Sequence, residues 1–226
     1  MARLARFIVP GIPHHVTQRG NGRQQVFFEP NDYALYRDLL KEHAAAHGVT
    51  VWSWVLMPNH VHLILVPEAA DSLRACLSKV HRAYAGHIHA RERRTGHFWQ
   101  GRFGCVAMDE AHLMAAIPYV ALNPVRARLT KSAKAWKYSS VHAHLDPAKG
   151  DGITDTAPVL SRVGDFAGLL RVGEDEALSM ALRRAESVGR PLGDGAFMAW
   201  IEAKLGRDAR AGKRGPRKRG PRKPGN

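Results

Sequence analysis

Cysteine is scarce in this sequence, and long apolar runs are missing altogether. The 226 residues include two cysteines, Cys76 and Cys105, so a disulfide framework and a C-x-x-C metal pair are both excluded. No run of about eighteen or more apolar residues occurs, and we therefore expect no membrane span. The N-terminal residues lack the apolar segment and the cleavage site of a secretory signal. These absences favour the reducing environment of the cytoplasm.

Histidine is absent from the last third of the chain. All thirteen histidines lie at or before His144, so we expect the chemistry of the protein to reside in residues 1–150. An apolar content of 45% and an aromatic content of 8% are sufficient for one folded domain of ordinary size plus an appendage.

Basic charge is concentrated in two blocks that flank a mildly acidic segment. Residues 1–150 carry 19 basic and 10 acidic side chains, residues 151–206 carry 6 and 9, and residues 207–226 carry 9 and 1. A polyanion such as nucleic acid is a natural partner for such a chain, because neutralising each phosphate releases a counterion. A solvated surface that serves only solubility explains the same charge equally well.

The pattern of apolar residues predicts an α+β fold. Strand, helix, strand, strand, helix, strand and helix follow one another, which is typical of a ferredoxin-like antiparallel sheet with helices packed on it. The expected segments are strands at 13–21, 50–57, 60–66 and within 97–108, and helices at 31–47, 72–90, 109–128 and 138–145.

The composition changes beyond this core domain, which we place at residues 1–148. Residues 145–160 are rich in Asp, Pro and Gly and predict a linker. Residues 149–206 predict a helical C-terminal extension that either reads nucleic acid or packs on the core. Two short helices are expected there, at 174–188 and 194–205. Residues 207–226 repeat a basic Gly-Pro unit and predict a disordered basic tail.

The segment 57–65, MPNHVHLIL, places two histidines at the start of an apolar strand. Because side chains alternate across a strand, His60 and His62 share one face and Val61 points to the other. Two imidazoles at this spacing can bind one divalent cation, although they do not fill its coordination shell. A pair of half-buried histidines hydrogen-bonded to loop backbone is the alternative, and the short motif alone favours that alternative.

The segment 118–129, PYVALNPVRARL, combines a tyrosine with an asparagine four residues later. On a helix Tyr119 and Asn123 share a face, while Pro124 is expected to kink or loosen the helix. A tyrosine oxygen can attack phosphorus once its proton is removed, and the Asn123 amide oxygen can add a metal ligand. A packed aromatic on an amphipathic helix is the alternative for Tyr119. Pro118 either begins a new helical segment at Tyr119 or displaces its hydroxyl.

Arginines and aromatic residues are interleaved around the segment 96–103, GHFWQGRF. Arginine side chains suit phosphate groups and aromatic faces stack on unpaired bases, a combination typical of single-stranded nucleic-acid binding. A loop whose aromatic residues Phe98 and Trp99 plug the core is the alternative. The residues that we predict to contact nucleic acid are Arg19, Arg91, Arg93, Arg94, Trp99, Arg102, Arg126 and Arg128.

Five segments carry a resemblance to a known family: PHHVTQRGNGRQ, LMPNHVHLIL, GHFWQGRF, YVALNPVRA and YSSVHAH. In this order and spacing, over residues 1 to about 145, the chain resembles the REP-associated tyrosine transposases, which are single-tyrosine HUH transposases. The resemblance implies a ferredoxin-like HUH catalytic domain that cuts and joins single-stranded, often hairpin-forming, DNA with Mg²⁺ or Mn²⁺. It assigns the metal to His60, His62 and Asn123, and it makes Tyr119 the nucleophile that forms a covalent 5′-phosphotyrosine link. It also implies a monomer or a homodimer.

Three functions are compatible with these observations. The first is a metal-dependent single-stranded DNA endonuclease and strand transferase, a transposase that uses Tyr119. The second is a catalytically inactive protein that binds structured nucleic acid through its basic surfaces. The complete set of His60, His62, Tyr119 and Asn123 argues against this second function. The third is a metal-dependent hydrolase that activates water, which no HExxH or clustered acidic motif supports.

Overall fold

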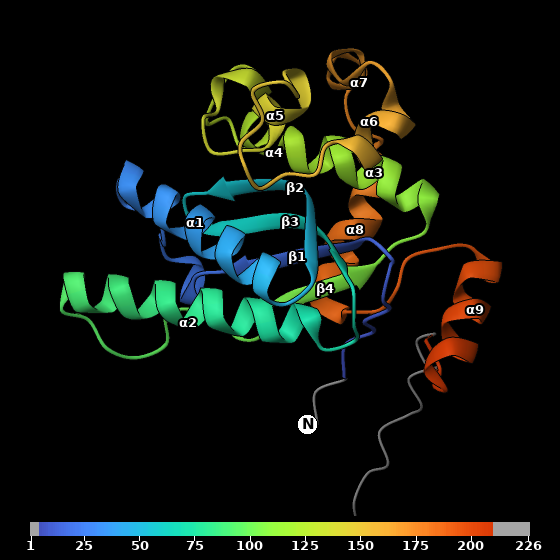
Figure 1. Ribbon diagram of the computed structural model, residues 1–226, viewed down its shortest axis with the longest axis horizontal. Coiled ribbons are helices and arrows are strands. Elements are labelled where there is room, and N and C mark those ends of the chain that lie inside the picture. Colours follow the sequence, from blue (N-terminus) through green and yellow to red (C-terminus); the bar gives the residue numbers. More distant parts are fainter. Residues whose placement is uncertain (1–4, 210–226) are drawn as a thin grey trace, which may run out of the picture.

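A four-stranded antiparallel sheet forms the centre of the computed structural model, which describes residues 5–209 apart from the side chain of residue 187 (Figure 1). Helix α1, Pro30–Ala46, connects β1 to β2, and α2, Ser72–Glu92, connects β3 to β4. The strands are β1 His14–Arg19, β2 Val49–Met57, β3 His60–Pro67 and β4 Gly104–Ala107, in the order β2-β3-β1-β4. This β-α-β-β-α-β arrangement confirms the predicted ferredoxin-like sheet.

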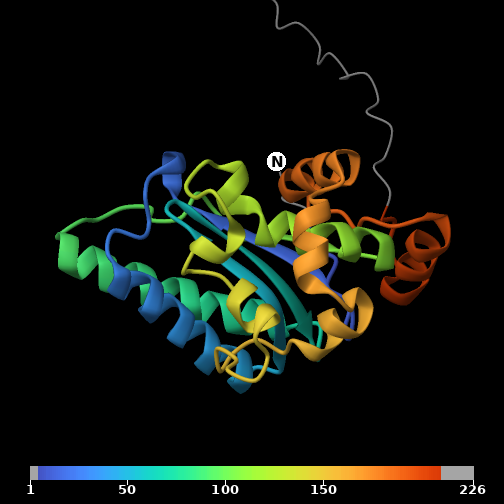
Figure 2. The same ribbon diagram turned by 90° about the horizontal axis from the view of Figure 1, so that it is seen from above.

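Strand β3 separates two apolar cores because its side chains alternate between the faces of the sheet. Val61 and Leu65 lie in the core that α1 and α2 cover, whereas Ile64 lies in the second core. His60 and His62 therefore share the face of Ile64. Figures 1 and 2 show α1 and α2 on one side of the sheet, with α3, Glu110–Ala121, and α8, Glu176–Val188, on the other.

The core under α1 and α2 is rich in aromatic side chains. Tyr36 of α1 and Tyr84 of α2 are fully buried, and the Tyr84 hydroxyl donates to the Val26 carbonyl at 2.7 Å. His81 of α2 is buried too, with its Nε2 atom 3.0 Å from the Tyr36 hydroxyl. The Trp99 indole donates to the His81 carbonyl at 3.0 Å. Trp99 thus packs against this core, as in the alternative that the sequence left open.

Helix α3, Glu110–Ala121, covers the second face of the sheet and continues through Pro118 without interruption. The break comes after its end, where α4, Asn123–Arg126, starts a new turn around Pro124. The expected loosening at Pro124 is confirmed, and the expectation of a new helical segment at Tyr119 is wrong. Pro118 removes one backbone hydrogen bond from the helix, but α3 stays helical because it is buried against β2 and β3.

The segment predicted as a linker, residues 145–160, lies against the sheet in its second half. The Trp54 indole of β2 donates to Asp151 Oδ2 and to Thr154 Oγ1, at 3.0 Å in both cases. The Asp151 carboxylate also accepts the Thr154 backbone N–H at 2.7 Å. A polar segment rich in Asp and Gly is thus ordered here, because its polar groups find partners on β2 and within the turn.

Four helices follow, of which the sequence predicted the last two. They are α6 Ala157–Val163, α7 Phe166–Val172, α8 Glu176–Val188 and α9 Gly195–Leu205. The carboxylates of Asp175 and Asp194 cap α8 and α9 by accepting a backbone N–H, which explains why both starts agree with the prediction. The shorter elements are η1 Asn21–Arg23, η2 Ala133–Ala135 and α5 Val141–Leu145.

Most of the predicted disordered tail, residues 210–226, lies outside the described residues. Its first residues remain packed: the Ala209 N–H donates to Glu202 Oε1 of α9 at 3.0 Å, and the Ala209 side chain is buried. Within residues 5–209, no helix combines the length and the apolarity that crossing a bilayer requires.

The buried histidine of α2 predicts a loss of stability in acid. Desolvation, followed by the charge of Arg6, lowers the pKa of His81 to about 3. The unfolded chain, with an ordinary histidine pKa, takes up the proton first as the pH falls, so stability is complete above about pH 6.5 and is lost below it. We expect His81 alone to cost about 2 kcal/mol of unfolding free energy between pH 7 and pH 5.

Urea unfolding at the two pH values measures this cost. The His81→Gln variant cannot titrate at this position and should lose about 2 kcal/mol less than the wild type between pH 7 and pH 5. Other buried histidines act in the same direction in both proteins, so the difference between the two profiles isolates His81. Parallel profiles would show that His81 is protonated without penalty in the folded state.

Candidate active site

Strands β1 and β3 bring histidines from distant parts of the sequence onto one face of the sheet. They pair with Thr17 opposite His62, so His15, two residues from Thr17, faces the same way. His15 Nε2 and His62 Nδ1 lie 3.0 Å apart, in hydrogen-bond contact. Their rings stack in parallel planes with 5.2 Å between centroids. Both side chains are buried.

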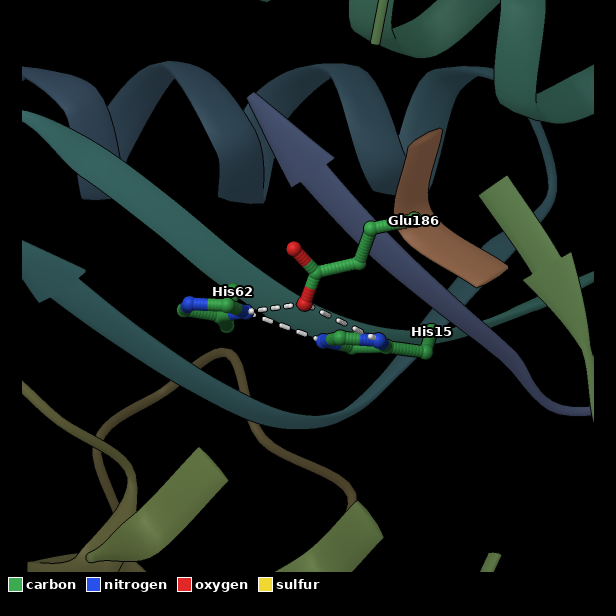
Figure 3. A group of neighbouring side chains, drawn as sticks. All are labelled: His15, His62 and Glu186. Carbon is green, nitrogen blue, oxygen red and sulfur yellow. Dashed lines mark hydrogen bonds and ion pairs between the residues drawn. The ribbon is translucent and has the colours of Figure 1, made fainter. Parts of the chain in front are cut away.

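Helix α8 adds a carboxylate to this histidine pair. Glu186 Oε1 lies 3.7 Å from His62 Nδ1 and 4.0 Å from His15 Nδ1 (Figure 3). Glu186 reaches this position because α8 packs on β4 and α3. Gly104 of β4 leaves room for the Glu186 backbone, since a Cβ atom there would lie 3.0 Å from the Glu186 carbonyl oxygen. A site confined to residues 1–150, as the histidine distribution led us to expect, would miss this carboxylate.

The phenol of Tyr119 points into the same cluster. Its Oη atom donates to Glu186 Oε1 at 3.2 Å, and its ring stands edge-on to His15 and His62, at centroid distances of 5.6 and 5.5 Å. The side chain is buried, and the guanidinium carbon of Arg126 lies 4.2 Å from the centre of its ring. The preceding proline therefore does not displace the hydroxyl from the histidine pair.

Burial governs the protonation of this cluster. Desolvation lowers the pKa of His15 to about 3 and the pKa of His62 well below its ordinary value, so both imidazoles are neutral near pH 7 and keep a lone pair. Desolvation raises the pKa of Glu186 to about 7, while the Tyr119 hydrogen bond and nearby guanidinium groups oppose the rise. Burial, and then the charge of Glu186, raises the pKa of Tyr119 to about 12. Tyr119 is therefore a protonated phenol at neutral pH.

The side chains around Glu186 suit a divalent metal ion. His15, His62 and Glu186 each offer one ligand atom, and these atoms lie within 4.8 Å of one another. Imidazole nitrogen and carboxylate oxygen are common ligands of first-row metal ions. His15 Nδ1 is buried and has no hydrogen-bond partner within residues 5–209, which leaves one imidazole nitrogen for an ion or its water. These residues form a possible His/Glu metal site.

Of the three predicted metal ligands, His62 belongs to this group and His60 adjoins it. His60 stands edge-on to His62 with 4.9 Å between ring centroids, but its Nδ1 atom contacts Asn59 Oδ1 at 2.6 Å and Arg19 Nη1 at 3.2 Å. Asn123, the first residue of α4, is buried. Asn123 and Tyr119 therefore lie in two consecutive helices, because α3 ends at Ala121.

Two residues of the cluster were not predicted. His15 lies within the motif PHHVTQRGN, and an antiparallel pairing of that strand with the strand at 60–66 would have placed it near His62. Glu186 follows Tyr119 by 67 residues and has no local signal, because a single acidic residue in an amphipathic helix usually faces solvent.

Three of the predicted arginines lie around the cluster. Arg19 contacts His60, Arg126 covers the Tyr119 ring, and Arg102 lines a cavity beside the cluster. They come from β1, from α4 and from the loop before β4, so the tertiary fold and not the sequence spacing brings them together.

The other predicted arginines lie elsewhere. Arg91 of α2 binds Glu29 Oε1 at 2.6 Å and Asp32 Oδ1 at 2.5 Å, so its charge holds the start of α1. Three more are exposed: Arg93, Arg94 and Arg128.

Comparison with known proteins places the chain among transposases. A family model described as "Transposase IS200 like" matches residues 9–123, about half of the chain. A solved REP-associated tyrosine transposase, bound to a REP hairpin, is 20% identical and has a TM-score of 0.56, with 69% of this chain and 90% of that chain covered. A protein from Deinococcus radiodurans R1, provisionally described as a transposase, is 23% identical with a TM-score of 0.38, with 51% of this chain and 92% of that chain covered. No curated protein matches the sequence.

The close approach of α8 to β4 predicts that Gly104 tolerates no side chain. A Cβ atom at this position would lie 2.6 Å from Thr17 Oγ1 and 3.0 Å from the Glu186 carbonyl oxygen. Gly104→Val should therefore lower the unfolding free energy by about 1–3 kcal/mol, as overpacking usually does.

Denaturant unfolding measures this loss. Gly86→Ala in α2 is the control, because a Cβ atom there meets nothing within 4 Å, and it should stabilise the protein by up to about 1 kcal/mol. If Gly104→Val were as stable as the wild type, the described packing of α8 against β4 would be wrong.

Proposed function

Since the chain belongs to the IS200-like transposase family, we propose that it cuts and rejoins single-stranded DNA through a covalent link between Tyr119 and a 5′ phosphate. The family gives the role of a transposase. The finer chemistry is supported by one observation above all: the Tyr119 hydroxyl lies 3.2 Å from a carboxylate that adjoins two neutral imidazoles. The core tyrosines Tyr36 and Tyr84 each satisfy the hydroxyl with one neutral partner, whereas the partner of Tyr119 is a carboxylate.

Tyr119 acts as the nucleophile in this proposal. Its oxygen bonds to phosphorus, the bond from phosphorus to the 3′ oxygen breaks, and the leaving 3′ oxygen takes up a proton. One phosphodiester bond replaces another, so the reverse reaction rejoins DNA without ATP. The phenol must lose its proton, and the Arg126 guanidinium over its ring favours the resulting anion. Glu186 orients the phenol through the hydrogen bond that it accepts.

His62, His15 and Glu186 would hold the divalent cation. When bound, Mg²⁺ or Mn²⁺ supplies polarisation of the oxygens on the scissile phosphate. The Glu186 carboxylate is the reason to prefer this set of ligands. Mg²⁺ and Mn²⁺ prefer oxygen ligands, and the negative charge of the carboxylate offsets the charge of the ion. The set predicted from the sequence, His60, His62 and Asn123, shares His62 and remains the alternative.

Single-stranded or hairpin-forming DNA is the proposed substrate. Two observations support it: the solved protein of similar fold was bound to a REP hairpin, and the candidate site of this chain is ringed by arginines. A monomer or a homodimer remains a prediction from the sequence resemblance.

Two other functions make different predictions about cleavage. An inactive nucleic-acid-binding protein would bind DNA tightly and cut none with any divalent ion. A hydrolase that activates water would cut DNA without forming a protein adduct, and its cleavage would survive the loss of the Tyr119 hydroxyl.

The covalent link is tested by trapping it. Wild-type protein incubated with single-stranded hairpin oligonucleotides and Mg²⁺ or Mn²⁺ should give a protein–DNA adduct on a denaturing gel. Tyr119→Phe should give none, a loss of at least about 1,000-fold, because it removes the attacking oxygen. Tyr138→Phe is the matched control and should form the adduct normally. An adduct that persists in Tyr119→Phe would rule out this nucleophile.

The ligand set is tested by measuring Mn²⁺ affinity. His62→Ala should abolish binding, and Glu186→Gln should weaken it about 10- to 100-fold, since it removes a charged ligand. His87→Ala, at an exposed position of α2, should bind like the wild type. Normal binding by Glu186→Gln together with weak binding by His60→Ala and Asn123→Ala would favour the set predicted from the sequence.

A further inference from the structure

A cavity of about 540 Å³ lies beside the candidate active site. Its walls are the C-terminal end of β1, the edge strand β4, the loop at residues 100–103 and the C-terminal turns of α8. Glu186 lines it and also accepts the hydrogen bond of Tyr119. The cavity therefore begins where the proposed nucleophile lies.

The charges on the cavity wall favour an anion. Four arginines line it, namely Arg6, Arg19, Arg102 and Arg183, against the single carboxylate of Glu186. They approach from different elements: the N-terminal segment, β1, the loop before β4, and α8. Arg183 also lies near the nucleophile, with its guanidinium carbon 5.7 Å from the centre of the Tyr119 ring. Guanidinium groups converging from several directions suit a phosphate group.

The remainder of the wall suits the organic part of a ligand. Phe103 and Val188 supply apolar surface, and Gln18 and Gln100 supply amide groups. The Gln18 amide donates to the Gly101 carbonyl at 3.1 Å, which fixes the position of that side chain. A volume of this size falls in the range of about 300–1,000 Å³ that holds a small organic molecule and exceeds what a bare phosphate requires.

We infer that this cavity receives one unpaired nucleotide next to the scissile phosphate, with its phosphate at the arginines and its base inside. The inference rests on the proposed function and adds to it a subsite for single-stranded substrate. Helix α8, which supplies Arg183, Glu186 and Val188, lies beyond the residues 9–123 that match the family model. Most of the cavity wall lies within the residues that match the family model, and α8 adds to it side chains from outside that part of the chain.

Equilibrium binding tests the subsite separately from cleavage. The Tyr119→Phe protein, which cannot form the adduct, is titrated into fluorescent DNA stem-loops that share one sequence and carry zero, one or two unpaired nucleotides at the 5′ or the 3′ end. We expect one unpaired nucleotide at one of the two ends to lower the Kd about tenfold, the usual effect of burying one base. A second nucleotide should add much less.

Variants assign this gain to the cavity. Arg102→Gln, made in the same background, should lose most of the gain from the extension, in excess of any loss that it shows with the blunt stem-loop. Arg102→Lys should recover part of the gain, and Arg82→Gln, at an exposed position of α2, should keep all of it. An abasic residue in the extension should give less than about a third of the gain, because the cavity then stays unfilled.

Three results would overturn the subsite: no gain at either end, an equal loss for Arg102→Gln with and without the extension, or a full gain with the abasic residue. The proposed function fails by a different result, the absence of any adduct with wild-type protein. If the extension raises the affinity but the wild-type protein forms no adduct, the proposed subsite stands and the proposed cleavage reaction is wrong.

Discussion

The hydrogen bond from Tyr119 to Glu186 is the contact on which the candidate site depends. It joins the helix that carries the phenol to the helix that carries the carboxylate, over a sheet face that presents His15 and His62. A carboxylate is costly to bury, and the raised pKa of Glu186 records that cost. The guanidinium groups of Arg19, Arg126 and Arg183 offset part of it. A largely buried carboxylate with a raised pKa, next to a phenol and two imidazoles, is typical of candidate functional sites.

The alternation of side chains in β1 and β3 determines which residues can take part. Every second residue of β3 lies in one of two separate cores, so the strand has apolar residues on both faces and polar ones only near its start. The antiparallel register then sets His15 diagonally across from His62. The possible metal site therefore depends on two paired strands and on Glu186 of α8, and not on the H-x-H motif alone.

Local patterns in the sequence were sufficient for the sheet, for α1, α2, α3, α8 and α9, and for the shared face of His60 and His62. They were also sufficient for the loosening at Pro124, because a proline has no N–H to donate to the preceding helical turn. These patterns failed where contacts between distant segments determine whether a segment is ordered or which partner a side chain has. The Trp54 indole orders the segment around Asp151 through a hydrogen bond. Arg91, which was predicted to contact nucleic acid, forms an ion pair with Asp32. Glu186 enters the site from a distant helix, and no spacing rule connects it to Tyr119.

The late position of α8 in the chain bears on how the protein is made. Both histidines and Tyr119 leave the ribosome well before Glu186 does, since the carboxylate follows Tyr119 by 67 residues. During synthesis the nascent chain can pair its strands and bury its first core while the phenol still lacks its acceptor. A product truncated by a premature stop codon before α8 would carry the family's motif residues in a protein whose site was never assembled. Translation must therefore continue through α8 before the carboxylate can join the two imidazoles and the phenol.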